Sequence, residues 1–258
     1  MASNSPGYHY TWLGDATGLA HTLSETLGVS HDQANAVIHS WLLCVGLIGL
    51  ALLGRMGLNA ANAKQGLEKY APDTSLTIRN FWEIFVGGLK NLLDGILEHG
   101  DSKNAWFFGL CATLFIFVLG GNLMGLVPGF IAPTGDFDTN LAMALAVLLV
   151  FNVAGLVRNG FGYILHLFGP VWWLAPLIFV VEFLGVFVVR PASLTLRLTG
   201  NMFGDHMVFG IMSDLTYLVI PTIFLGLGAF VSFIQALVFT LLSAVYIALA
   251  TAHEEDHH

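Results

Sequence analysis

The chain has 258 residues, of which 56% are hydrophobic and 10% charged, and its mean hydropathy is +0.76. These values lie far from the balance of a soluble domain and predict an integral membrane protein. The formal net charge is −8, with the acids gathered at the ends and in loops, which argues against nucleic acid as a partner. Residues 1–35 carry no Lys or Arg and no early apolar block, so they predict a polar extramembrane segment rather than a secretory signal.

Apolar stretches long enough to cross a bilayer follow this segment. Crossing about 30 Å of hydrocarbon takes roughly 20 helical residues. Backbone polar groups find no water in the bilayer, and the alternating pattern of a lipid-facing barrel is absent, so helices are expected. The sequence therefore predicts an all-α membrane protein with one membrane domain, residues 36–258. Its five membrane-embedded helices are expected at about 36–56, 104–127, 139–157, 171–215 and 220–252.

The basic residues predict the orientation of these helices. Six of the nine Lys and Arg residues lie from Arg55 to Lys103, and Arg158 follows the third span. The connections at 128–138 and 213–220 contain acids and no base. By the positive-inside rule we expect the N-terminus to lie outside and the C-terminal tail 253–258 to lie in the cytoplasm. Asp138 is a candidate N-cap for the third span.

Residues 75–99 differ in character from the spans. At about 100° per residue their charged side chains share one arc, and aromatic and aliphatic side chains occupy the other faces. This pattern predicts an amphipathic helix on the cytoplasmic membrane surface. A soluble helix packed on a domain is the weaker alternative, because no neighbouring segment offers a soluble core. The charged residues are Arg79, Glu83, Lys90, Asp94 and Glu98.

The last two spans are longer than a crossing needs. They run for about 45 and about 33 residues, and a crossing takes roughly 20. Either the first of them breaks, or both lie strongly tilted as a hairpin that turns near Tyr217 to Pro221. Ordinary tilt absorbs only a modest excess, so a curved or cylindrical protein surface is the expected packing partner.

Arg197 is a charged residue inside the fourth span. A guanidinium at bilayer depth costs about 2.5 to 3.5 kcal/mol and is normally held by an opposite charge or a watery cavity. On an uninterrupted helix, five further polar residues lie on its side over about 35 Å. They are Glu182, Arg190, Ser193, Asn201 and Asp205. His206 falls on another face of the helix and is expected to face span five or the bundle interior.

Span five has a milder polar side. Small residues there allow close approach of helices or water, although Ser and Gly in membrane helices commonly only pack. Gln235 is the position on this span with the clearest functional interest. The residues that share this side are Gly228, Ser232, Gln235, Ser243 and Tyr246.

The segment RPASLTLRLTGNMFGDH, Arg190 to His206, resembles the fourth-span motif of subunit a of the F-type ATP synthases. That subunit is the membrane stator against which the ring of c subunits turns. Supporting segments are NLMGLVP from Asn122, PTGDFDTNLAMAL from Pro133 and FIQALVFTLLSAVYIALA from Phe233. The similarity covers most of the chain from about residue 75 onward, in the family's order.

The resemblance implies roles for particular residues. Arg197 corresponds to the essential arginine, which ionises each arriving ring carboxylate and blocks direct proton leakage. Asn201, Asp205, His206 and Gln235 would line an outer proton half-channel, and Glu182 and Ser193 a cytoplasmic one. A packing role is the simpler alternative for His206.

Two positions depart from the family pattern. Glu182 stands eight residues before Arg190, one more than expected, and Gly228 occupies a site that is titratable in some members. Arg190 itself either binds a lipid phosphate at the cytoplasmic interface or assists Arg197, and the interfacial role is favoured.

The resemblance also implies location and partners. These are a bacterial inner membrane, a c-subunit ring, peripheral-stalk b subunits, lipid and, indirectly, the catalytic head. No cofactor or metal is expected, the acidic and histidine-rich tail being an exposed terminus. The phosphate-loop pattern GxxxxGK[ST] is absent, so the subunit would bind no nucleotide and catalyse nothing alone.

Two other functions remain open. One is a stand-alone proton-coupled secondary transporter in which Arg197 binds an anionic substrate, although the sequence lacks the internal repeat common in such folds. The other is a structural assembly subunit, which leaves the polar side of span four unexplained. The coupling ion is open between protons and sodium, because the choice belongs mainly to the ring.

Overall fold

The computed structural model describes most of the chain and places its ordered elements in helices. The C-terminal tail, Glu98 and the turn after Leu215 at Tyr217 lie outside the described residues. The described residues are 11, 13–14, 17–62, 78–96, 105–127, 129–160, 162–163, 173–216 and 219–251.

The described elements confirm the all-α fold class. Five helical segments are long and apolar enough to cross a membrane: His31–Met56, Trp106–Gly125, Phe137–Asn159, Ala175–Met212 and Ile220–Thr251. The elements are α1 Leu19–Leu27, α2 His31–Asn62, α3 Ile78–Asp94, α4 Ala105–Gly125, η3 Pro133–Gly135, α5 Phe137–Asn159, α7 Ala175–Leu184, η4 Gly185–Val189, α8 Arg190–Leu215 and α9 Val219–Thr251.

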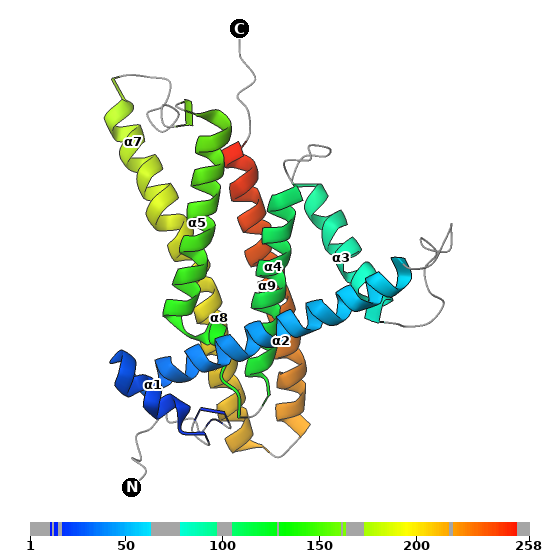
Figure 1. Cartoon of the computed structure of the whole chain (residues 1–258). Helices are drawn as coiled ribbons and strands as arrows, with labels where there is room; N and C mark the ends of the chain where they lie inside the picture. The colour runs from blue at the N-terminus through cyan, green and yellow to red at the C-terminus, as the bar shows by residue number, and fades with distance from the viewer. Residues whose placement is uncertain are drawn as a thin grey trace.

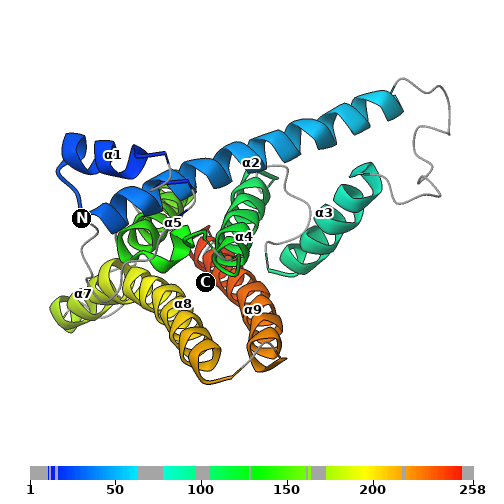
Figure 2. The ribbon, with the colours of Figure 1, turned by 90° about the horizontal axis from the view of Figure 1, so that it is seen from below.

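The helices form a bundle with one open edge. Figure 1 shows α4, α5 and α9 side by side, with α1 near one end and the end of α9 at the other. Figure 2 shows α8 and α9 on the edge opposite α2, with α4 and α5 between them. Described residues of this chain therefore do not cover the outer sides of α8 and α9.

Small residues explain how closely α9 packs in the bundle. Ala236, Ser243 and Ala244 are fully buried, and Phe233 meets Phe115 of α4 edge to face at 5.8 Å between ring centroids. The Ser243 hydroxyl donates to the Phe239 carbonyl at 2.8 Å. Around Ser243, this side of α9 therefore packs against neighbouring helices, the simpler of the two roles that the sequence left open.

Hydrogen bonds at helix starts explain where α2 and α5 begin. The Ser30 backbone N–H donates to Gln33 Oε1 at 3.1 Å, and the Gln33 N–H donates to Ser30 Oγ at 3.3 Å, a reciprocal cap. This cap starts α2 at His31, before the apolar run. Asp136, rather than Asp138, caps α5 by accepting from the Thr139 N–H at 3.2 Å. Asp138 instead accepts a hydrogen bond from Gln33 Nε2 at 2.9 Å.

Helix α3 is amphipathic and lies against α2 and α4. Leu89 and Leu93 are buried, and Phe85 contacts Phe115 with ring centroids 5.8 Å apart. Phe81 and Ile84 remain exposed. Helix α3 is not among the candidate spans of the described chain, and its position on a membrane surface stays a prediction.

A π-helical turn interrupts the long fourth span. Gly185–Val189 forms this turn, and the Arg190 N–H donates to the Gly185 carbonyl, five residues back. Pro191 explains it, because proline lacks an N–H and its ring clashes with the carbonyl four residues earlier. The turn accommodates the extra residue between Glu182 and Arg190. The assumption of an uninterrupted helix is therefore wrong here, and Glu182 does not keep the angle assigned to it relative to Arg197.

Candidate functional site

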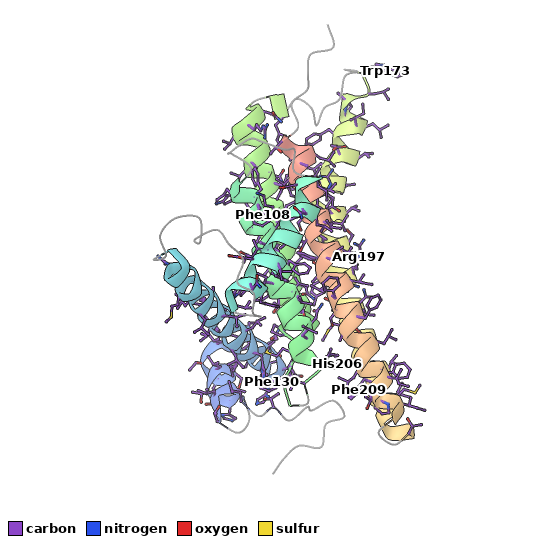
Figure 3. All side chains as sticks on the ribbon, turned by 90° about the vertical axis from the view of Figure 1, so that its right-hand side faces the viewer. Phe108, Phe130, Trp173, Arg197, His206 and Phe209 are labelled. Atoms are coloured by element: carbon purple, nitrogen blue, oxygen red, sulfur yellow. The ribbon has the colours of Figure 1, made fainter. Side chains whose placement is uncertain are left out.

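Arg197 lies near the middle of the helical run from α7 to α8, on the open edge of the bundle. Figure 3 shows it between Trp173 at one end of this run and Phe209 toward the other. Its side chain is exposed, and no hydrogen bond or ion pair to its guanidinium is formed within the described part of the chain. The cation is thus available to a group outside these residues.

Packing on the other side of α8 holds Arg197 in this direction. Leu194, Leu198 and Met202 are buried, each with at most 4% of its surface exposed. They recur every three to four residues and form the bundle-facing stripe of the helix. Since Arg197 stands outside this stripe, burial of the stripe turns the guanidinium outward.

The surface of α8 beside Arg197 contains two glycines and is not covered by other described residues. Asn201 is exposed, and a Cβ added at Gly200 or Gly204 would meet no described heavy atom within 4 Å. Leu196 and Phe203 flank these positions and are also exposed. Glycines in membrane helices allow another helix to approach closely, so this surface suits a helical partner.

A cavity of about 230 Å³ lies between α8 and α9, beyond Arg197 toward their connection. Asp205 is the one charged residue in its lining, among described residues, and it is half-buried. Gly228 faces the same cavity from α9, and a Cβ added there would lie 3.0 Å from Leu126 Cδ2. The structure thus brings together Asp205 and the glycine that departs from the family pattern. A volume of about 230 Å³ leaves room for water beside this carboxylate.

His206 lies on a different side of α8 from this cavity. A Cβ added at Gly125 of α4 would be 3.3 Å from its Nε2, and the imidazole is exposed. Figure 3 shows His206 below Arg197 along the helix. The structure therefore directs His206 toward the end of α4 and does not place it with Asp205 in the cavity lining.

Gln235 lies within the bundle-facing side of α9. Its side chain is 8% exposed, and the described residues contain no hydrogen bond between it and Arg197. One turn earlier, Asn122 Nδ2 donates to the Ser232 carbonyl at 3.4 Å. The structure does not join Gln235 to Arg197 directly.

A buried polar network behind Arg197 was not predicted from the sequence. Asn140 Nδ2 donates to the Thr134 carbonyl at 2.7 Å and to Thr199 Oγ1 at 2.8 Å. Thr134 Oγ1 donates to Asn122 Oδ1 at 2.5 Å. Asn140 is fully buried, and its Oδ1 has no hydrogen-bond partner among the described residues. The segments that resemble the family contain all four residues, but only the fold brings them together.

The opposite half of the run contains Glu182, Arg190 and Ser193, all half-buried. Ser193 Oγ donates to the Arg190 carbonyl at 2.9 Å, a bond within its own helix. The Arg190 guanidinium carbon lies 5.7 Å from the Phe151 ring centroid and 4.9 Å from that of Tyr246. The guanidinium is therefore engaged by rings of α5 and α9. This geometry does not favour the interfacial lipid contact expected from the sequence.

Burial and the charges of Arg190 and Glu182 all affect the pKa of Tyr163. Burial raises the pKa of its phenol, the positive charge of Arg190 opposes that rise, and the negative charge of Glu182 adds to it. Tyr163 also donates from its hydroxyl to Asn152 Oδ1 at 3.0 Å. Glu182 and Arg190 thus act on one neighbourhood at this end of the bundle.

Comparison with known proteins identifies the family. The family described as ATP synthase A chain matches residues 38–248. The chain belongs to the ATP synthase A chain family. It is 41% identical over 238 residues to the ATP synthase subunit a of Trichlorobacter lovleyi, covering 91% of this chain and 96% of the relative. It is 39% identical over 233 residues to the ATP synthase subunit a of Geobacter sulfurreducens, covering 90% and 94%.

A third ATP synthase A chain relative extends the comparison. The ATP synthase subunit a 3 of Pelobacter propionicus is 41% identical over 230 residues, covering 88% of this chain and 93% of the relative. The family match runs through α4, α5, α8 and most of α9, and it includes Arg197, the cavity and the buried network. Membership in this family confirms the resemblance and favours a subunit of an ATP synthase over a stand-alone transporter.

Proposed function

We propose that this chain is subunit a of a bacterial rotary ATP synthase and that Arg197 couples proton movement to rotation of a c-subunit ring. Family membership and five helices of membrane-crossing length support the general assignment. The observation that carries the role of Arg197 is its exposed guanidinium, which is unpaired among the described residues, on the open edge of α8.

The chemistry follows from the cost of charge in lipid. A ring carboxylate that faces lipid is protonated, because desolvation disfavours its ionised form. Opposite Arg197 the nearby positive charge lowers the pKa of that carboxylate, and it releases its proton. Arginine stays protonated throughout, so it also prevents a proton from passing directly between the two sides of the membrane.

Two half-channels would bring protons to and from this position. The cavity that contains Asp205 supports an outer path, and exposed Asn201 lies between it and Arg197. His206 and Gln235 would contribute to the outer path through water or side-chain movement, since neither lines the cavity. Glu182 and Ser193 would serve the cytoplasmic path. Each proton that moves through 100 mV releases about 2.3 kcal/mol, so several per turn can drive ATP formation in an attached catalytic head.

The proposed arrangement in the membrane follows the charge distribution. The N-terminus lies in the periplasm and the C-terminus in the cytoplasm of a bacterial inner membrane. The c-ring would occupy the open edge of α8 and α9. Peripheral-stalk b subunits and lipid would contact the remaining surface, with α3 on the cytoplasmic face.

The test is Arg197→Ala in the assembled complex. ATP-driven proton pumping by inverted membrane vesicles should be lost, while c subunits and the catalytic head still co-isolate with the chain. Arg158→Ala, which removes an exposed arginine at the end of α5, should pump normally. Normal pumping by Arg197→Ala, or proton-coupled transport by the purified chain alone in liposomes, would reject the proposal.

A further inference from the structure

Arg190 is held between two aromatic rings where three helices meet. Its guanidinium carbon is 4.9 Å from the Tyr246 centroid of α9 and 5.7 Å from the Phe151 centroid of α5. Both distances lie within the range of cation–π attraction. Phe151 is 1% exposed, and the two rings contact each other with centroids 5.9 Å apart. We call Arg190, Phe151 and Tyr246 the arginine clamp.

The clamp lies directly after the π-helical turn. The Arg190 N–H closes that turn on the Gly185 carbonyl, and Pro191 prevents the ordinary α-helical bond at the next position. A π turn holds one residue more than an α turn, so conversion between the two would rotate the helix beyond it by about 100°. The start of α8 is therefore the point where its rotation is least fixed by backbone hydrogen bonds.

Arg197 follows Arg190 by seven residues, about two helical turns. Any rotation of α8 about its axis at this point would turn the Arg197 guanidinium away from the open edge. The clamp opposes such rotation, because turning Arg190 would withdraw its cation from both rings. The Asn140 to Thr199 bond acts beyond Arg197, so the two contacts hold α8 on either side of it.

We propose that Arg190 is a positioning residue for Arg197, and that Phe151 and Tyr246 hold it so that α8 resists the pull of a passing ring carboxylate. This inference rests on the proposed function. Arginine suits the position because its planar guanidinium remains charged and stacks on aromatic faces. The role differs from that of a lipid-phosphate ligand, because the guanidinium faces rings of the bundle.

The experiment compares Tyr246→Phe, which keeps the ring, with Tyr246→Leu, which removes it, in the assembled complex. Protons pumped per ATP hydrolysed should stay near wild type in Tyr246→Phe. They should fall about fivefold in Tyr246→Leu, the shift that one lost cation–π contact can produce. The ratio should fall at least as far in Arg190→Gln, which loses both ring contacts. The double variant should be no worse than Arg190→Gln alone, because the contact with Tyr246 is already lost there.

A second readout reports the direction of α8. Gly200→Cys has open space on the exposed edge, and its disulfide yield with a cysteine placed on the c subunit should fall in Tyr246→Leu and not in Tyr246→Phe. A general loss of stability would instead reduce the amount of assembled complex and leave the yield per complex unchanged.

Three results would overturn the clamp. They are full coupling in Tyr246→Leu, a defect in Arg190→Gln alone, which would indicate a role of charge only, and additive defects in the double variant. If Tyr246→Leu fails to assemble, the disulfide yield of Gly200→Cys in Arg190→Gln decides the matter, because that variant leaves both rings intact. A lost coupling ratio with an unchanged yield would overturn the clamp. Arg197→Ala separates the proposed function from the clamp. Normal proton pumping by Arg197→Ala would reject the proposed function. Loss of pumping in Arg197→Ala together with normal coupling in Tyr246→Leu would reject the clamp alone.

Discussion

Asn140 of α5 donates a hydrogen bond to Thr199 of α8, with Nδ2 2.8 Å from Oγ1. Thr199 stands two residues after Arg197 and on another face of the helix, so the bond fixes one side of α8 while the arginine occupies the other. Asn140 is fully buried and also donates to the Thr134 carbonyl at 2.7 Å. The segment before α5 is thereby tied to the helix that carries the proposed functional cation.

Thr199→Val should destabilise the protein, because valine has nearly the shape of threonine but leaves one N–H of the buried amide unpaired. The expected cost is about 1 to 3 kcal/mol of unfolding free energy, measured by denaturation in detergent. Thr195→Val is the control, since the Thr195 hydroxyl donates only within its own helix, to the Pro191 carbonyl at 2.9 Å. Equal stability of the two variants would mean that the bond to Asn140 contributes nothing specific.

Gly200→Leu should block the ring without disturbing the chain. A Cβ at this position meets no described heavy atom within 4 Å, so folding should be unaffected. A bulky side chain on the open edge would, however, hold α8 apart from a helix of the ring. ATP-driven proton pumping should fall by about tenfold or more, a change of roughly 1.4 kcal/mol. Gly49→Leu on α2 is equally open and should pump normally. A pumping Gly200→Leu complex would place the ring elsewhere.

Gly228→Leu should narrow the outer path, because a side chain there projects into the cavity that contains Asp205. Passive proton conductance, measured in vesicles stripped of the catalytic head, should fall about tenfold. Gly226→Leu lies two residues earlier, where an added Cβ meets no described heavy atom within 4 Å, and it should conduct as the unmodified chain does. Unchanged conductance in Gly228→Leu would show that protons do not enter through this cavity.

Deletion of Val188 should be tolerated. It removes the extra residue of the π-helical turn and gives Glu182 and Arg190 the seven-residue spacing expected for the family, while α8 keeps its rotation. Deletion of Phe203 within α8 should abolish pumping, because it rotates all that follows by about 100° against α5 and α9. Assembly and pumping of the two deletion variants are the measurements. Loss of function in both would mean that the π turn itself is required.

Apolar length made the main helices predictable, since a run such as 137–159 has few alternatives in a bilayer. The same reasoning missed features that depend on contacts between elements. Helix α2 begins early because Ser30 and Gln33 cap each other, and helix α1, which packs on α2, lies in a segment expected only to be polar. Local hydrophobicity predicts neither the early start of α2 nor the presence of α1.

In the candidate site, too, local sequence predicted some features and missed those that depend on contacts between helices. A charge inside an apolar span identified Arg197, and periodicity within α8 placed Asn201 on the same side. The two residues share the open edge. It failed across the π-helical turn, where the angle per residue changes, and it gave no means to see that Arg190 would meet rings of α5 and α9. Pro191 and the eight-residue spacing between Glu182 and Arg190 were the available signals of the π-helical turn. Which residues Arg190 contacts depends on how α5, α8 and α9 pack together.

The most direct test is an experimental structure of this chain in its membrane complex. The account predicts a c-ring along the open edge of α8 and α9, with the Arg197 guanidinium about 4 to 6 Å from a ring carboxylate, close enough to favour its ionised form. An Arg197 side chain that faces lipid, or one paired with an acid of its own chain and no ring beside it, would contradict the account.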